Sequence, residues 1–255
     1  MKLIIKNYAS ILVLILLTLF QYKCNTNKQE SPVIENLILQ KVTPINVPEP
    51  SGLALSYDGR YLWSVGDSDS KVHKLDLNGN VITSFKVNGE DLEGITVIDS
   101  INLAVILERT REIVVLDTSG KEINRKKLDL KGKLNEGLEG ICFNNKTKDF
   151  YLLNEKQPGL LIKTDSSFKV LFRKNLKLAK DYSDIFFSNL DYTLWILSDE
   201  SKKIIQTDLN GNKIKEYQIK VEQPEGLVVD YKNKRIFIVS DKKEELYEYK
   251  LPKNN

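Results

Sequence analysis

The chain has 255 residues, of which 29% are charged, and a formal net charge of +3 at pH 7. An excess of positive charge this small gives no strong attraction to nucleic acid, so we expect no nucleic-acid partner. Two cysteines and a single histidine argue against a disulfide framework, a histidine-rich zinc site and a Ser-His-Asp triad of the usual kind.

The first 24 residues are typical of a targeting segment. Lys2 and Lys6 precede a largely apolar run over 11–20, which is short for a membrane span of about 20 residues and right for a signal-peptide core. Cys24 follows, then a polar linker over 25–32. Its position looks like that of the lipidated cysteine of a bacterial lipoprotein, although Lys23 stands where such signals have a small residue. We expect export, lipidation of Cys24 and attachment to a membrane of the cell envelope; an uncleaved anchor is the alternative.

Residues 33–253 are predicted to form one domain built from a repeat. One strand is expected within Ile34–Val47, and a five-residue motif then recurs at steps of 42, 46, 44 and 42 residues. A period of about 40–45 residues made of short strands is typical of a β-propeller. The third residues of the five motifs are Gly52, Gly94, Gly140, Asp184 and Gly226.

Each repeat predicts four antiparallel strands. Two apolar runs come first, a third run often ends in Asp, and a tight turn such as Asn78-Gly79 leads to a more polar fourth strand. The fifth repeat has only three strands and stops near Leu251, so the N-terminal strand is expected to complete the last blade and close the ring. The predicted fold class is all-β, a five-bladed propeller. A β-sandwich, the alternative, does not explain five motifs in phase.

Two rings of mostly acidic residues are expected at one mouth of the central channel. One ring precedes the third motif residue, and the other ends the second strand of each repeat. Because neighbouring strands run in opposite directions, the start of the first strand and the end of the second share a face. The first ring is Ser51, Glu93, Glu139, Ser183 and Glu225, and the second is Asp67, Glu108, Glu155, Asp199 and Asp241.

Carboxylates this close repel one another unless a cation compensates them. Calcium binds six to eight oxygen ligands in flexible geometry, so Ca²⁺ is the predicted cofactor. The alternative is that each acid accepts backbone N–H groups or pairs with a cation such as Arg109, Lys156 or Lys242. The candidate ligands are Glu93, Glu139, Glu225, Asp184, Asp199 and Asp241, with Ser51, Asp67, Glu108, Glu155 and Ser183 as further residues of the central face.

The remaining residues with reactive side chains are interpreted as structural. Cys142 lies in an apolar strand and is expected to be a small buried hydrophobe. His73 lies in a third strand between Val72 and Lys74 and has no predicted catalytic partner.

Six segments in this order and spacing together resemble the SdiA-regulated (YjiK-like) family. They are Pro50-Ser-Gly-Leu-Ala, Leu62-Trp-Ser-Val-Gly-Asp, Asp91-Leu-Glu-Gly-Ile, Glu136-Gly-Leu-Glu-Gly-Ile, Leu197-Ser-Asp-Glu-Ser and Gln223-Pro-Glu-Gly-Leu. The resemblance covers about residues 33–252. It implies a five-bladed propeller that binds calcium at its central face, is exported or membrane-associated, and has no established enzymatic role.

Two functions follow. The first is a monomeric, non-enzymatic calcium-binding propeller that presents a surface to a small ligand or an envelope protein. The second is a calcium-dependent hydrolase of a lactone or phosphoester, because some looser relatives among the NHL, gluconolactonase and phytase-like propellers have such activity. A gluconolactonase-type site also uses Asn, and neither Asn144 nor Asn154 is placed in the mouth by the sequence.

Overall fold

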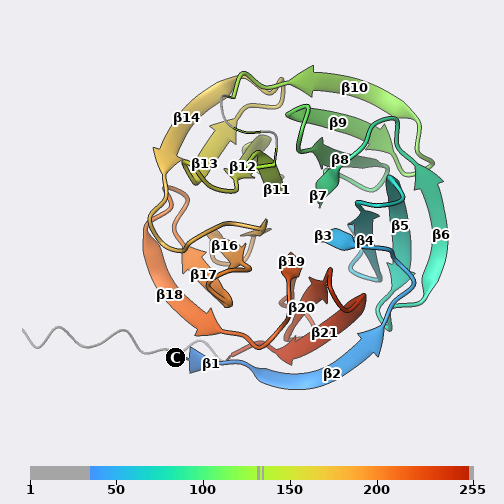
Figure 1. Cartoon of the computed structure of the whole chain (residues 1–255), viewed down its shortest axis with the longest axis vertical. Coiled ribbons are helices and arrows are strands. Elements are labelled where there is room, and N and C mark those ends of the chain that lie inside the picture. The colour runs from blue at the N-terminus through green and yellow to red at the C-terminus, as the bar shows by residue number, and fades with distance from the viewer. Residues whose placement is uncertain (1–34, 131–132, 134, 253–255) are drawn as a thin grey trace, which may run out of the picture. The chain divides into compact units, whose positions relative to one another are not determined.

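The computed structural model describes residues 35–130, 133 and 135–252. The chain divides into two units, Met1–Val33 and Ile34–Asn255, and all described residues belong to the second. This unit contains 21 strands and, within the described residues, no helix. The strands form five sheets arranged radially around an axis, as Figure 1 shows, which confirms the predicted five-bladed propeller.

Each blade runs outward from an inner strand that lies next to the axis. Blade one contains β3 (Pro50–Leu55), β4 (Tyr61–Gly66), β5 (Lys71–Asp76) and β6 (Val81–Lys86). Blade two contains β7 (Leu92–Val97), β8 (Asn102–Leu107), β9 (Glu112–Asp117) and β10 (Glu122–Lys127). Blade three contains β11 (Leu138–Asn144), β12 (Asp149–Asn154), β13 (Leu160–Thr164) and β14 (Val170–Asn175). Blade four contains β15 (Asp184–Ser188), β16 (Thr193–Ser198), β17 (Lys203–Thr207) and β18 (Lys213–Gln218).

Blade five is completed by a strand from the other end of the domain. Its inner three strands are β19 (Pro224–Asp230), β20 (Arg235–Ser240) and β21 (Glu245–Lys250), and β2 (Ile38–Pro44) pairs antiparallel with β21 as the outermost strand. The structure therefore confirms closure by the N-terminal strand. It adds a short β1 (Glu35–Asn36), which pairs parallel with β18 and so links blades four and five at the rim (Figure 1).

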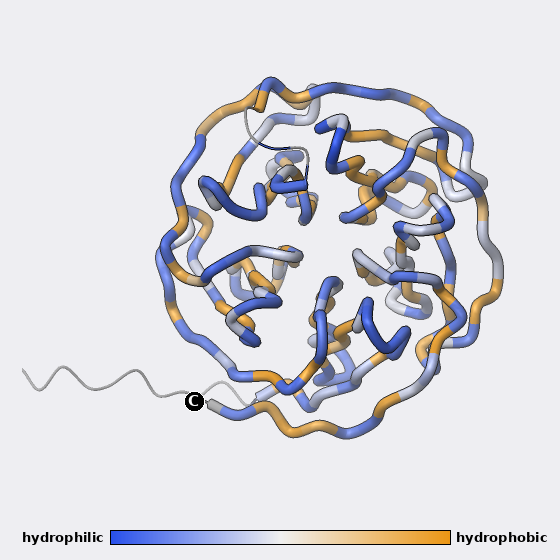
Figure 2. The backbone as a smooth tube through the Cα atoms, viewed as in Figure 1, coloured by the Kyte–Doolittle hydropathy of each residue, from blue (hydrophilic) through white to orange (hydrophobic). Residues whose placement is uncertain are grey.

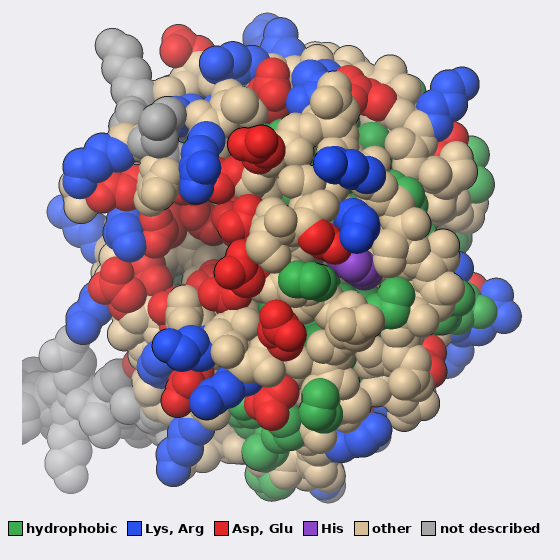
Figure 3. All heavy atoms as spheres, turned by 45° about the vertical axis from the view of Figure 1, so that its right-hand side comes forward, with side chains coloured by type: hydrophobic (Ala, Val, Ile, Leu, Met, Phe, Trp, Pro, Cys, Tyr) green, Lys and Arg blue, Asp and Glu red, His purple; other side chains and the backbone are tan. Residues whose placement is uncertain are grey.

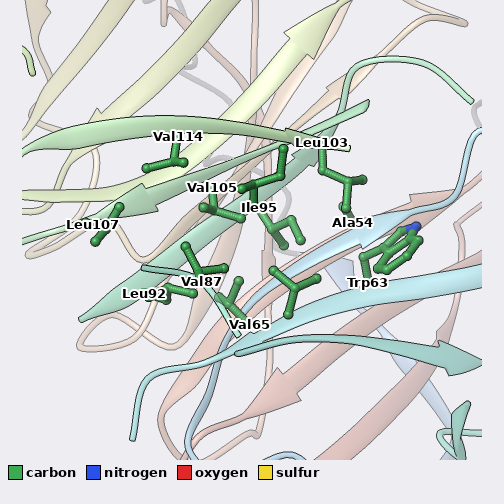
Figure 4. Packing of buried hydrophobic residues seen from close by; sticks show 12 residues of the cluster. Ala54, Trp63, Val65, Val87, Leu92, Ile95, Leu103, Val105, Leu107 and Val114 are labelled. Atoms are coloured by element: carbon green, nitrogen blue, oxygen red, sulfur yellow. The ribbon is translucent and has the colours of Figure 1, made fainter. Parts of the chain in front are cut away.

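The hydrophobic core lies between neighbouring blades. Leu92, Leu103 and Val105 are fully buried and pack against Val65 and Trp63 of the preceding blade, as Figure 4 shows. All six residues of β12 and of β16 are buried, whereas the outer strand β10 is largely exposed. Hydrophobic and hydrophilic residues alternate along the outer ring in Figure 2. Burial thus decreases from the inner strands to the outermost strand of each blade, and the apolar runs of the sequence lie in the inner and second strands.

The motif glycines occupy the point where inner strands of neighbouring blades approach most closely. A Cβ atom on Gly52 would lie 2.6 Å from the carbonyl oxygen of Glu93, and one on Gly226 would lie 2.9 Å from the carbonyl carbon of Gly52. Real Cβ atoms do not tolerate such contacts, so a side chain here would push the blades apart. Asp184 takes the equivalent position in blade four, where its backbone lies against Gly140.

The aspartate that ends the third strand caps the turn behind it. In blades one to four the Oδ1 atom of this residue accepts two backbone N–H groups, two and four positions later, at 2.8–3.0 Å. The turn glycines Gly79, Gly120 and Gly211 have positive φ, as their turns require. The capping residues are Asp76, Asp117, Asp165 and Asp208.

Candidate functional site

A cavity of about 380 Å³ opens at one end of the inner strands and is called the central cavity here. All ten positions of the two predicted rings line it, and Figure 3 shows acidic side chains gathered around a hollow on this face. Five further residues complete the lining: Glu49, Asn135, Lys156, Asp181 and Glu200.

A recurrent backbone hydrogen bond brings the two rings together. The N–H of the residue after the second strand donates to a carbonyl just before the inner strand: Asp67 to Glu49 at 3.0 Å, Glu108 to Asp91 at 3.0 Å, and Asp241 to Gln223 at 2.9 Å. Glu155 makes the same bond to Gly137 at 2.9 Å. In blade four the Asp199 N–H donates to the Ser183 hydroxyl at 3.2 Å instead. The end of the second strand is thus held against the start of the first, and the side chains of both ends reach one cavity.

Asp184 lies outside the central cavity, unlike the other residues considered as ligands. Its carboxylate is buried and accepts the backbone N–H groups of Ile185 at 2.8 Å and Leu227 at 2.7 Å, and a further one from Leu53. Leu53 belongs to blade one, which does not adjoin blade four, so the carboxylate reaches across the axis. Asp184 therefore closes the channel between inner strands and is not positioned with the acids of the mouth.

A third set of acids, which is not among the predicted site residues, lies two residues before the first ring. Asp91 is 6% exposed, and its carboxylate pairs with the Arg109 guanidinium at 3.0 Å and accepts the Arg109 N–H at 3.1 Å. Asp181 is 3% exposed and accepts the N–H of Glu200 and the hydroxyl of Ser198. Comparing the repeats at that position, which reads Glu49, Asp91, Gly137, Asp181 and Gln223, would have found them.

Two groups of three carboxylates could each hold a cation. In each group, one oxygen per residue lies within 4.8 Å of the oxygens of the others. One group is Asp67, Asp91 and Glu93, and the other is Glu108, Glu139 and Glu155. Both offer only oxygen atoms, with no thiolate or imidazole, and such a donor set suits a hard cation such as Ca²⁺.

The electrostatics of the central cavity disfavour ionised carboxylates. Burial, and then repulsion by other acids of the cavity, raises the pKa of Glu93 and of Glu139 well above the usual value. Burial and repulsion by other acids also raise the pKa of Glu225, and the hydroxyl of Ser183 opposes this shift. Burial also raises the pKa of Glu108 to about 7 and that of Asp67 to about 6.

Protein cations compensate these acids unevenly. Lys156 pairs with Glu155 at 2.7 Å, and Lys202 pairs with Asp199. Among the described residues, no lysine or arginine forms an ion pair with Glu93, Glu139 or Glu225. The three glutamates of the first ring therefore face the cavity without a compensating charge from the protein.

The remaining candidate residues have roles elsewhere in the fold. The Asn154 amide donates to the backbone carbonyls of Pro158 in the following loop and of Glu136 before β11, and Asn144 caps a turn at the far end of its strand. Neither residue lines the central cavity. Cys142 is buried in the core, and burial raises the pKa of its thiol. His73 is buried in blade one, where its ring nitrogens contact Ser84 Oγ at 2.9 Å and Asp69 Oδ1 at 3.3 Å.

Cys24 and the predicted targeting segment lie outside the described residues. Within the described residues, no helix is long and apolar enough to cross a membrane. The lipid anchor and the cellular location therefore stay predictions.

The fold is shared with solved structures of low sequence identity. The glutaminyl cyclase of Myxococcus xanthus superposes with a TM-score of 0.70 at 14% identity, over 88% of this chain and 100% of the other. Virginiamycin B lyase from Staphylococcus aureus gives 0.52 at 15% identity, over 80% and 66% of the two chains. A streptogramin B lyase gives 0.52 at 18% identity, over 84% and 74%. At these identities the likeness concerns the fold alone.

A search of the curated proteins finds no match to this chain. The model of the SdiA-regulated family matches residues 33–249, which is most of the chain and nearly all of the propeller. The order of the six motif segments and the five-bladed fold agree with that match. The chain belongs to the SdiA-regulated family.

Proposed function

We propose that this protein is an exported, lipid-anchored propeller that binds calcium in the central cavity and presents that face to a ligand or an envelope partner. The observation that carries the proposal is the first ring: Glu93, Glu139 and Glu225 converge on one cavity without an ion pair from a described lysine or arginine. Burying carboxylates that repel one another is costly unless a charge or donor compensates them. A hard cation bound by their oxygens supplies that compensation.

Calcium binding is tested by isothermal titration calorimetry on metal-free protein. Wild type is expected to bind calcium, and the double variant Glu139→Gln with Glu225→Gln is expected to lose most of the heat. A matched control, Glu122→Gln with Glu216→Gln, removes the same charge from outer strands, where these acids pair with Arg125 and Lys203. Equal binding by both double variants, or none by wild type, would contradict the proposal; the acidic mouth would then be a docking surface for a cationic partner.

Export and lipidation are tested separately, because they concern residues at the other end of the chain. Metabolic labelling with a fatty-acid analogue is expected to mark wild type and to leave Cys24→Ala unlabelled. Equal labelling of both proteins, or no labelling of wild type, would contradict a lipid anchor on Cys24.

A second candidate function is calcium-dependent hydrolysis of a lactone or phosphoester. The observation that favours it is the position of Glu108, a carboxyl of the central cavity that burial makes harder to ionise in the metal-free protein and that is a candidate general base. Glu108 lies within the same oxygen cluster as Glu139 and Glu155, which would hold the ion. Bound calcium would polarise the substrate oxygen. Lactone and phosphoester substrates, screened with calcium and with chelator, distinguish this function from binding alone: chelator-sensitive turnover that Glu108→Gln abolishes would favour it.

A further inference from the structure

A second cavity of about 380 Å³ lies between blades one and two, away from the acids of the mouth, and is called the side cavity here. Its walls come from the β3–β4 turn, from β4, β5 and β6, and from β8 and the turn before it. Its lining includes Tyr57, Tyr61, Trp63, Lys74, Asp58 and Asp99.

Lys74 stands at a position where blades three, four and five place a paired polar side chain, whereas blade two has Val115 opposite Ala104 there. In blade one and in these three blades the residue lies on the third strand, opposite an aromatic residue of the second: Lys74 faces Trp63, and Lys163 faces Tyr151. In blade three the Lys163 ammonium pairs with Asp149 at 2.7 Å. Blades four and five follow the same pattern. Gln206 donates to Asp191 at 3.1 Å, and Glu248 lies 3.6 Å from Arg235.

Blade one lacks the residue that would pair with this lysine. Tyr61 begins β4 where Asp149 begins β12 in blade three. The Lys74 ammonium lies over the ring of Tyr61 at 4.1 Å and near that of Trp63 at 5.4 Å. No described carboxylate forms an ion pair with it. Lys74 therefore lies against two aromatic rings and has no described carboxylate as an ion-pair partner.

The other charged groups of the side cavity are already engaged. Asp58 pairs with Arg60 at 2.6 Å, and Asp99 accepts the backbone N–H groups of Ile101 and Asn102 at 2.9 Å. Neither acid forms an ion pair with Lys74. Tyr57, at 68% exposure, is among the most exposed large hydrophobic side chains of the described residues, and it lines this cavity.

We propose that the side cavity binds a small organic anion, a carboxylate carried on a flat aromatic body. The ammonium of Lys74 supplies the charge that meets the carboxylate, and the exposed ring of Tyr57 and the half-buried ring of Tyr61 supply aromatic surface for the body of the ligand. The volume suits a small molecule. The proposal does not depend on calcium, because no residue of the two oxygen clusters lines the side cavity.

The test uses 4-fluorobenzoate as the probe and its neutral amide, 4-fluorobenzamide, as the matched ligand. Binding to the full chain is followed by ligand-observed fluorine NMR. Wild type is expected to bind the carboxylate, and Lys74→Gln is expected to bind it at least tenfold more weakly, since a hydrogen bond to a charged group contributes about 1.5 kcal/mol or more. Binding of the amide is expected to be weaker in wild type and nearly unchanged in the variant.

Lys163→Gln is the control, because it removes a lysine from the same repeat position in a blade where Asp149 already pairs with it. It is expected to leave benzoate binding unchanged. Equal affinity of Lys74→Gln and wild type for benzoate overturns the proposal, and so does equal affinity of wild type for acid and amide. An absence of binding at millimolar concentration overturns it as well.

Tryptophan fluorescence gives a second readout that identifies the location. The chain has two tryptophans, and Trp195 lies in blade four, where it stacks on Tyr217. In Trp195→Phe the remaining emission comes from Trp63, which lines the side cavity. Benzoate is expected to change that emission, and Lys74→Gln in the same background is expected to suppress the change. Benzoate binding that leaves Trp63 emission unaltered would place the anion elsewhere and overturn the proposal.

Discussion

The central cavity and the inner-strand contacts around Asp184 both contain carboxylates with raised pKa values. The two regions differ in the groups that surround these carboxylates. Asp184 accepts three backbone N–H groups from inner strands, including strands of blades one and five. Glu139 lines the central cavity, and its pKa is raised by burial and then by Glu93, Glu108 and Glu225. The difference shows that a raised pKa alone does not distinguish a structural acid from one that faces a cavity. An acid surrounded by protein donors stabilises the fold, whereas the acids surrounded by other acids are the ones that we propose to bind a cation.

The largest expected effect is that of Asp184→Ala, which breaks the structural side of the comparison. Removing the carboxylate leaves buried N–H groups of Ile185, Leu227 and Leu53 without an acceptor, at about 1–3 kcal/mol for each unsatisfied group. We expect the free energy of unfolding, measured with urea, to fall by roughly 3–5 kcal/mol. Glu139→Gln serves as the comparison, because it should cost little or stabilise the metal-free protein. Similar losses in both variants would contradict the distinction between the two regions.

The next largest effect is expected from calcium itself. A ligand that binds only the native state stabilises it by about 2.7 kcal/mol at a hundredfold excess over Kd. Such an increment raises the Tm of a domain of this size by several degrees. The double variant Glu139→Gln with Glu225→Gln should lose this shift while being at least as stable as wild type in chelator. Identical melting of wild type in calcium and in chelator would falsify the calcium proposal.

A further effect is expected from pH, because the cavity acids have raised pKa values. The pKa of Glu108 is raised from 4.5 to about 7 and that of Asp67 from 3.8 to about 6, so in this window the native state binds more protons than the unfolded chain. The free energy of unfolding of metal-free protein should therefore fall as pH rises from about 4.5 to about 7, by a few kcal/mol at most, since one pKa unit corresponds to about 1.4 kcal/mol.

Urea unfolding in chelator at several pH values measures this slope. Saturating calcium should reduce it, because the bound ion compensates the ionised form, and Glu108→Gln should reduce it as well. Stability of the metal-free protein that rises with pH across this window would show that the acids of the mouth are compensated by the protein.

The smallest effect is expected from Lys156→Gln, which sharpens the comparison at the edge of the cavity. Lys156 pairs with Glu155 at 2.7 Å and with Glu200 at 3.2 Å, and so neutralises part of the ring. Its removal should tighten calcium binding by about two- to threefold, in keeping with the modest energy of partly exposed ion pairs. Calorimetry at low and high salt provides the check. Weaker calcium binding in the variant would mean that Lys156 orders the site instead of competing with the ion.

Several features of the site could be predicted from the residues in order. The repeat located the start of each inner strand, and the alternation of strand direction brought both rings to one cavity, as the lining shows. The position of Asp184 directly after Ser183 predicts that it lies at the mouth. Neighbouring residues of a strand, however, point to opposite sides, so the prediction is wrong for Asp184. Its partners, Leu53 and Leu227, are distant in sequence, and no local pattern identifies them.

The amino-acid sequence by itself determined the number of blades, the closing strand and the positions of the two rings, because strand periodicity and turn residues are local signals repeated five times. Only the tertiary structure decided which carboxylates are compensated. These ion pairs and hydrogen bonds depend on how strand ends and neighbouring blades meet. Examples are Asp91 with Arg109, Glu155 with Lys156, and Asp184 with the N–H of Leu227. The same is true of Lys74, whose missing partner is evident only when the blades are superposed in register. Partners are a property of the assembled ring, since hydrogen bonds and ion pairs depend on distances of a few ångströms that chain order does not specify.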